Sequence, residues 1–131
     1  MNNYEWKTAQ IEGLMRLRDI LMKSEVNCVL HTPHHDVGYI EMLDTPRGPH
    51  AVYDTHTKAY DIWKWGNKRP RMKSMNLSAE DAAEILTTEY FLAKAKRIRK
   101  RRKDLSLDEI MQILRRGYQY TQHQTILRRD N

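Results

Sequence analysis

The stretch "HAVYDTHTKAYDIWKW", residues 50–65, decides the fold of this chain. Its two outer runs, HAVYDT (50–55) and AYDIWKW (59–65), are rich in the β-branched and aromatic residues that strands favour. The polar residues HTK (56–58) lie between them and suit a turn. Two such runs joined by a short polar segment are typical of a β-hairpin. The sequence therefore predicts an antiparallel hairpin at the centre of the chain.

The residues before this hairpin add two strand candidates. The run VNCVLH (26–31) has apolar residues at alternate positions, on one side of a strand, and VGYIEML (37–43) alternates in the same way. DTPRGPH (44–50) is predicted to be a loop, because two prolines and a glycine do not fit a central strand. The simplest arrangement is an antiparallel meander of three or four strands.

Helical spacing of apolar residues flanks the predicted sheet. It indicates a first helix over about 8–23 and a second over about 79–103, the latter begun by an N-cap at Ser78. GNKRPRMKSMN (66–76), just before the second helix, is predicted to be a loop. A third helix is predicted to begin at Ser106, with a reciprocal cap between Ser106 and Glu109.

The apolar stripe of the second helix changes sides along its length. Ala82 and Leu86 share one side, whereas Phe91, further along, lies nearly opposite them. Ala95 and Ile98 continue the second side. The helix is therefore predicted either to bend near its middle or to pack its halves against different surfaces.

Together these elements predict an α+β fold. It has an N-terminal helix, a small antiparallel β-sheet of three or four strands, and then two or three C-terminal helices. We expect one domain over residues 1–131, because 131 residues are enough to bury one core. The helix and β-meander would occupy 1–77, and a basic helical part would occupy 78–131.

Charge and cysteine content limit the function classes. The formal net charge is +6; eleven Lys and Arg against nine Asp and Glu in 1–77 leave a surplus of two, and twelve against eight in 78–131 leave four. Such an uneven basic surplus favours an acidic partner. The one cysteine, Cys28, cannot form an internal disulfide, so we expect a reducing, cytoplasmic setting and a core role for its thiol.

The sequence also argues against a membrane protein. Its apolar runs are far shorter than the roughly 20 residues that cross a bilayer. The first residues, MNNYEWKTAQIEG (1–13), lack the apolar segment of a signal peptide. We therefore expect no membrane association and no secretion.

The strongest functional signal is the basic run in AKAKRIRKRRKD (93–104). Eight of the ten residues in 94–103 are Lys or Arg, and no Asp or Glu lies in 93–103. These like charges repel each other on a helix, and the phosphates of a nucleic acid would relieve the repulsion and release counterions. The alternative is a solvated helix end without a partner. The predicted phosphate contacts are Lys94, Lys96, Arg97, Arg99, Lys100, Arg101, Arg102 and Lys103; Lys96, Arg97, Lys100 and Lys103 project away from Ala95 and Ile98.

Two further segments extend this prediction. WKWGNKRPRMK (63–73) interleaves tryptophans with cations, and exposed aromatic rings stack on splayed bases, although a strand tryptophan equally suits a core. LSLDEIMQILRRGYQYTQHQTILRR (105–129) has a weak likeness to a helix-turn-helix, with a turn longer than usual. The additional predicted contacts with nucleic acid are Lys68, Arg69, Arg71, Arg115 and Arg116, and Gln119, Gln122, His123 and Gln124 would face bases.

Two groups of residues raise the question of a metal. His31, His34 and His35 carry imidazoles that suit zinc, but their spacing is not specific and a polar loop explains them equally well. Asp61 and Lys64 are separated by two residues, which departs from the acid–x–Lys spacing of many Mg²⁺-dependent nucleases. The other carboxylates considered for such a site are Glu41, Asp44 and Asp54. We expect no metal and no cofactor.

The function that these patterns favour is that of a small basic regulatory or accessory protein that binds nucleic acid through the phosphate backbone. A protein-binding inhibitor or adaptor, using the same cations against an acidic protein surface, is the alternative. A metal-dependent nuclease is the minor alternative. No enzyme activity is expected, because Gly-rich phosphate loops and the GxSxG and CxxC motifs are all missing. The sequence leaves DNA or RNA as partner and homo-oligomer formation open.

Overall fold

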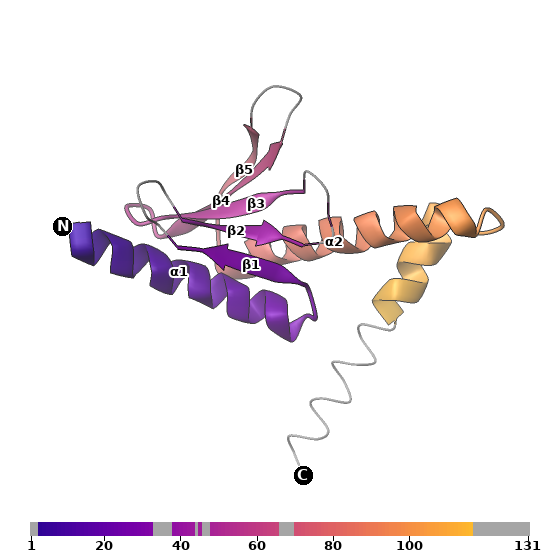
Figure 1. Cartoon of the computed structure of the whole chain (residues 1–131), viewed down its shortest axis with the longest axis horizontal. Coiled ribbons are helices and arrows are strands. Elements are labelled where there is room, and N and C mark those ends of the chain that lie inside the picture. Colours follow the sequence, from indigo (N-terminus) through magenta and orange to yellow (C-terminus); the bar gives the residue numbers. More distant parts are fainter. Residues whose placement is uncertain (1–2, 33–37, 44, 46–47, 66–69, 117–131) are drawn as a thin grey trace, which may run out of the picture.

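The computed structural model describes residues 3–32, 38–43, 45, 48–65 and 70–116. The elements follow in the order α1 (Asn3–Lys23), β1 (Cys28–His31), β2 (Tyr39–Met42), β3 (His50–Asp54), β4 (Ala59–Trp65), β5 (Pro70–Leu77) and α2 (Ala79–Arg101), and residues 107–116 are also helical. The strands form one antiparallel sheet in the order β1-β2-β3-β4-β5 (Figure 1). The predicted α+β fold is confirmed, but the sheet has five strands rather than three or four.

The central hairpin and its turn are confirmed. β3 and β4 pair antiparallel over their whole described overlap, from His50 opposite Trp63 to Asp54 opposite Ala59. The Asp54 carboxylate accepts the amide of His56 (2.8 Å), and the Asp54 carbonyl accepts that of Lys58 (2.8 Å). One aspartate therefore holds the turn between the two strands.

The prediction of a loop over residues 66–76 is wrong for its second part, because Pro70–Leu77 forms the edge strand β5. Pro70 is the first residue of that edge strand, where a missing N–H does not interrupt a ladder. The strand is bulged, and at the bulge Asn76 has a φ of 56° and donates its amide to the Asp61 carboxylate (3.0 Å). This side-chain acceptor on β4 stabilises an irregular strand that periodicity does not reveal.

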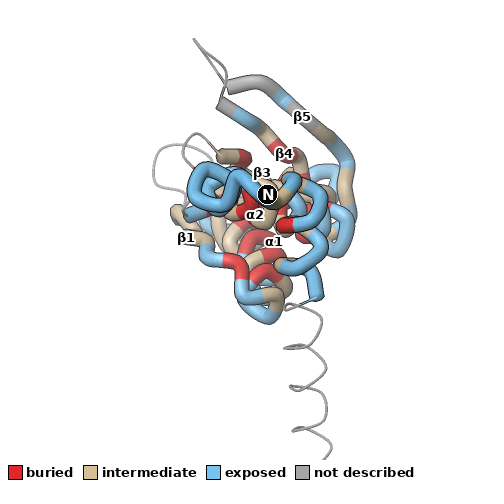
Figure 2. The backbone as a smooth tube through the Cα atoms, turned by 90° about the vertical axis from the view of Figure 1, so that its right-hand side faces the viewer, coloured by how far each residue is buried: buried red, intermediate tan, exposed pale blue. Residues whose placement is uncertain are grey.

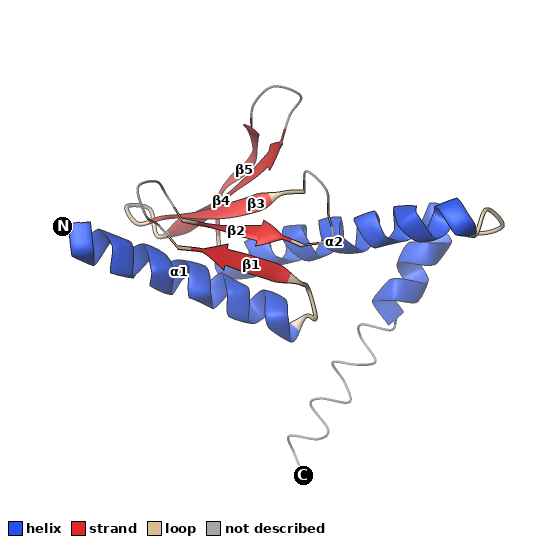
Figure 3. Ribbon diagram, viewed as in Figure 1, coloured by secondary structure: helices blue, strands red, loops and turns tan. Residues whose placement is uncertain are grey.

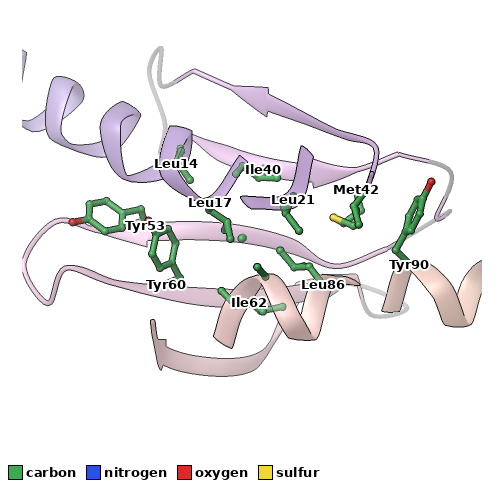
Figure 4. Packing of buried hydrophobic residues seen from close by; sticks show 14 residues of the cluster. Leu14, Leu17, Leu21, Ile40, Met42, Tyr53, Tyr60, Ile62, Leu86 and Tyr90 are labelled. Atoms are coloured by element: carbon green, nitrogen blue, oxygen red, sulfur yellow. The ribbon is translucent and has the colours of Figure 1, made fainter. Parts of the chain in front are cut away.

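One face of the sheet carries the core, and both long helices pack against it (Figure 3). Along the strands, buried residues alternate with partly exposed ones, as expected for a sheet covered on one side. Figure 2 shows the buried residues gathered where α1 and α2 meet the sheet. The side chains that point toward each other there are Leu14, Leu17, Leu21, Ile40, Met42, Tyr53, Tyr60, Ile62, Leu86 and Tyr90 (Figure 4).

α1 lies close to β3 because of a glycine and a buried amide. A Cβ at Gly13 would overlap the Tyr53 ring, and the Tyr60 hydroxyl donates to the Gly13 carbonyl (2.6 Å). The buried side chain of Gln10 donates to the Tyr53 carbonyl (3.4 Å) and accepts the Gly38 amide (2.8 Å). These contacts fix α1 across β3 and the start of β2.

α1 ends at Lys23 as predicted, although it begins at Asn3, several residues before the predicted start. The Val26 amide donates to the Leu21 carbonyl (3.0 Å), and the Glu25 amide donates to that of Met22 (3.0 Å). Glu25 has a φ of 58°, so the two bonds form a Schellman motif. The chain thereby reverses directly into β1.

α2 is one helix whose two halves pack on different surfaces, which is the second of the two predicted arrangements. Ser78 caps it by accepting the Asp81 amide (3.1 Å), and the first half packs on α1 and the sheet. In the second half Ala95 is fully buried, yet it lies outside the main core cluster. α2 ends at Arg101, two residues before its predicted end.

The helix at residues 107–116 follows α2 in the chain. It folds back beneath the end of α2 (Figure 1), and its Ile110 is 2% exposed and likewise outside the main cluster. The predicted reciprocal cap is confirmed, because the Glu109 amide donates to Ser106 Oγ (3.1 Å) and the Ser106 amide donates to the Glu109 carboxylate (3.2 Å). α2 and this helix therefore form a helical hairpin.

Candidate functional site

A groove of about 440 Å³ runs beside the second half of α2, where the ends of β3 and β4 meet it. We call it the basic groove. It takes one wall from α2, another from β4 and a third from the segment that precedes β3. Its lining residues are Thr45, Gly48, Pro49, Lys64, Glu89, Leu92, Ala93, Lys96, Arg97 and Lys100.

Helix geometry places three of the predicted phosphate contacts in this groove. Lys96 and Lys100 are four residues apart, so they lie on one side of α2 about 6 Å apart along its axis. Arg97 follows Lys96 and adds a guanidinium to the same wall. All three side chains are exposed, whereas Ala95, on the same helix, is buried. This agrees with the predicted direction of these three cations, away from Ala95. Ile98, the other residue of the predicted apolar sector, is 37% exposed, and Lys103 lies beyond the end of α2.

The fourth cation of the groove, Lys64, comes from β4 and was not among the predicted contacts. Its Nζ lies 3.8 Å from Oε2 of Glu89, which ties β4 to α2. The Lys64 side chain is 50% exposed and that of Glu89 is 18% exposed, so the lysine keeps donors for a ligand. Strand alternation could have placed Lys64, because it lies on the same side of β4 as the buried Ile62 and therefore faces the helices.

Cations outnumber acids in this groove. Four cationic side chains face one carboxylate, that of Glu89, among the described lining residues, which leaves a formal surplus of three positive charges. A concave surface lined by one sign of charge concentrates its field and attracts ligands of the opposite sign. Ammonium and guanidinium groups bind phosphate and carboxylate oxygens through charge-assisted hydrogen bonds. The groove is thus chemically suited to an anionic ligand.

A tight turn shapes the wall opposite α2. The Gly48 amide donates to the Thr45 carbonyl (2.7 Å), and the Thr45 hydroxyl donates to the Met42 carbonyl (3.1 Å) at the end of β2. A Cβ at Gly48 would overlap the Thr45 side chain. A side chain at position 48 would therefore displace Thr45 and disturb this turn.

The remaining cations of the basic run do not join the groove. The Lys94 ammonium lies 4.5 Å from the centroid of the Tyr90 ring, a cation–π contact. Arg102 makes a bidentate contact with Asp104 (2.8 and 3.0 Å), and this hydrogen bonding raises the pKa of Arg102 and lowers the pKa of Asp104. The other residues of the run, Arg99, Arg101 and Lys103, are exposed.

The predicted contacts outside the basic run are scattered. Arg115 lines a separate pocket of about 390 Å³ formed with α1 and the first half of α2, and Arg116 is exposed. Arg71 belongs to β5, where its backbone pairs with that of Lys64. Lys68 and Arg69 lie outside the described residues, as do Gln119, Gln122, His123 and Gln124 of the suggested helix-turn-helix.

The described residues give little support to either hypothesis of a metal site. Nε2 of His31 hydrogen-bonds the Glu41 carboxylate (2.8 Å), while His34 and His35 lie outside the described residues. Asp54 and Asp61 accept backbone amides in the turn and the bulge. Within the described ranges, no three His, Cys, Asp or Glu side chains are grouped so that they could hold a metal ion.

The sheet face turned away from the helices carries a row of rings. His31 stacks on its cross-strand partner Tyr39, with centroids 4.5 Å apart and planes inclined by 20°. Tyr39 meets His50 edge-on at 5.7 Å, and His50 lies opposite Trp63 in the β3–β4 ladder. Burial lowers the pKa of His50, and the nearby Glu41 carboxylate partly opposes that shift. We call His31, Tyr39, His50 and Trp63 the ring face.

Comparisons with protein-family models, curated proteins and solved structures find no match to this chain. In the part of the chain that the structure describes, no helix is both long and apolar enough to cross a membrane. Function is therefore inferred from the chemistry of the basic groove and the ring face.

Proposed function

We propose that this protein is a small regulatory or accessory protein that binds nucleic acid, and that the basic groove holds its phosphate backbone. The observation that carries the proposal is the convergence of Lys64 with Lys96, Arg97 and Lys100. Lys64 comes from β4 and the other three from α2, at least 32 positions further along the chain, yet they line one groove. These four positive charges face one carboxylate, that of Glu89, among the described lining residues. Positive charge therefore remains to bind an external anion.

A polyanion fits this arrangement better than a small anion. Like charges one turn apart on α2 repel each other, and a chain of phosphates relieves the repulsion at successive positions. Each neutralised phosphate also releases condensed counterions, which supplies most of the affinity of backbone binding. The exposed cations Arg99, Arg101 and Lys103 enlarge the positive field around the groove. Contacts of this kind position a nucleic acid without selecting its sequence.

The single cysteine, Cys28, agrees with a reducing, cytoplasmic setting for such a protein. Burial raises the pKa of its thiol, so the reactive thiolate is disfavoured at neutral pH. The thiol is free in this structure and partly buried against the core. A packing role in a reducing compartment accounts for it, and we place the protein in the cytoplasm on this ground.

The test compares two triple variants with equal charge. Lys96→Gln/Arg97→Gln/Lys100→Gln removes three cations that line the groove, and Arg99→Gln/Arg101→Gln/Lys103→Gln removes three that do not. The affinity for a duplex DNA of mixed sequence is measured over a range of salt concentrations. We expect the groove variant to lower the slope of log affinity against log salt by about 2.7, at about 0.9 for each lost phosphate contact. The matched variant should change it much less.

Two outcomes would count against the proposal. Equal slope changes in the two variants would mean that only the overall charge matters, and an unchanged slope in the groove variant would mean that the groove holds no phosphate. If the protein binds neither DNA nor RNA but retains a protein partner after nuclease treatment, and the groove variant loses that partner, the groove is an interface for an acidic protein surface.

A further inference from the structure

The ring face departs from the usual pattern of a half-covered sheet. The solvated side of an antiparallel sheet is normally polar. Here cross-strand neighbours bring His31 and Tyr39 from β1 and β2 next to His50 and Trp63 from β3 and β4. The His31 side chain remains 40% exposed, and Met72, opposite Trp63 on β5, is 39% exposed. Each strand therefore contributes a ring or an apolar side chain to the face turned away from both helices. The Glu41 carboxylate lies among them, hydrogen-bonded to His31 (2.8 Å).

Part of the ring face borders the basic groove. His50 and Trp63 lie at the strand ends next to the groove, whereas His31 and Tyr39 lie at the other ends of β1 and β2. Trp63 belongs to the ring face, and the next residue, Lys64, lines the groove. His50 belongs to the ring face, and the preceding residue, Pro49, lines the groove. Because adjacent residues of a strand point to opposite sides, His50 and Trp63 lie on one side of this sheet end and the groove lies on the other. A flexible chain that crosses this end would touch both.

From this juxtaposition we infer that the protein binds single-stranded nucleic acid, with phosphates in the basic groove and unpaired bases stacked on the ring face. The inference rests on the proposed function and specifies the kind of nucleic acid that is bound. Bases in a duplex are stacked inside the helix, whereas those of a single strand turn outward and stack on aromatic side chains. The rings of His31 and Tyr39, inclined by 20°, already form a short stack that a base extends. Stacking tolerates any base, so little sequence preference is expected.

The experiment uses three probes of one length, about 16 nucleotides, the upper end of what a small binding domain covers. They are a single strand of mixed sequence, the matching duplex, and an abasic single strand that keeps only the sugar–phosphate backbone. The variants are Trp63→Leu and Tyr39→Leu, which remove a ring, and Trp63→Phe, which keeps one. Val29→Thr is the control, since Val29 is 37% exposed and lies on the same face outside the ring row.

The unaltered protein should bind the single strand more tightly than the abasic strand and the duplex. Trp63→Leu and Tyr39→Leu should each weaken single-strand binding by about 5- to 150-fold, the range for the loss of one stacked base. Their affinity for the abasic strand should stay unchanged. Trp63→Phe and Val29→Thr should behave like the unaltered protein. Thermal unfolding of each variant checks the fold, and Tyr39→Leu decides the question if Trp63→Leu does not fold.

The two proposals fail in different ways. If single and abasic strands bind equally, or if removing a ring leaves single-strand affinity unchanged, the ring face does not stack bases, while the groove proposal stands. If the abasic strand does not bind and the groove variant changes nothing, the groove proposal fails, and this inference fails with it. Duplex binding as tight as single-strand binding also overturns the inference alone.

Discussion

The two halves of α2 belong to one continuous helix but have opposite surroundings. In the first half Leu86 is fully buried and Tyr90 is 1% exposed, both against α1 and the sheet. In the second half Ala95 alone is fully buried, and Lys96 and Lys100 project into an open groove. The first half therefore stabilises the fold by packing, whereas the second half exposes its positively charged side chains and contributes little to the core. Substitutions in the two halves should separate stability from binding.

The largest expected effect lies in the first half. Leu86→Ala leaves a cavity in the core and should lower the free energy of unfolding by about 2–5 kcal/mol. Ile98→Ala, in the second half, should cost far less, because Ile98 is already 37% exposed. Urea denaturation of both variants measures the difference. Equal losses would show that the two halves are packed alike and would remove the contrast.

A smaller effect is expected where the second half of α2 meets its neighbouring helix. Ser106→Ala removes the acceptor of the Glu109 amide (3.1 Å) and should lower the free energy of unfolding by about 0.5–2 kcal/mol. Ser106→Thr keeps a hydroxyl and should stay close to the unaltered protein. The denaturation midpoint measures both variants. An alanine variant as stable as the threonine variant would show that this cap contributes little to the hairpin.

The smallest effect on stability is expected in the groove. Lys96→Gln/Arg97→Gln/Lys100→Gln relieves like-charge repulsion of a few tenths of a kcal/mol for each pair, so the thermal midpoint should stay constant or rise slightly. Lys64→Gln is the informative companion, since it breaks the contact with the partly buried Glu89 and should lower the midpoint. A clear loss of stability in the triple variant would mean that these cations support the fold as well as the ligand.

Short-range signals account for the parts of the fold that were predicted correctly. The turn of the β3–β4 hairpin, the Ser78 cap and the reciprocal cap of Ser106 with Glu109 each depend on residues within a few positions of one another. Strand periodicity and capping act over that range, so one sequence reveals them. The change of sides along α2 was also visible, because helical spacing fixes which residues share a side.

β5 was not predicted, because the residues that stabilise it are distant in the sequence. Residues 70–77 lack regular alternation, and their strand depends on pairing with β4 and on the bond from Asn76 to Asp61, fifteen residues earlier. The position of Lys64 in the groove was not predicted for the same reason, since its salt bridge joins it to Glu89 on α2. The seven-residue run of β4 could place Lys64 on a side of the strand, but not beside a particular turn of α2.

By itself, the sequence determined the class of fold and the sign of the charge that the second half of α2 displays. Both follow from local spacing and composition, which act before any tertiary contact forms. Only the tertiary structure decided which cations share a site. It brought Lys64 to Lys96, Arg97 and Lys100. Packing of α2 against the sheet sets that selection, because it fixes the rotation of the helix and thereby which side chains face the groove.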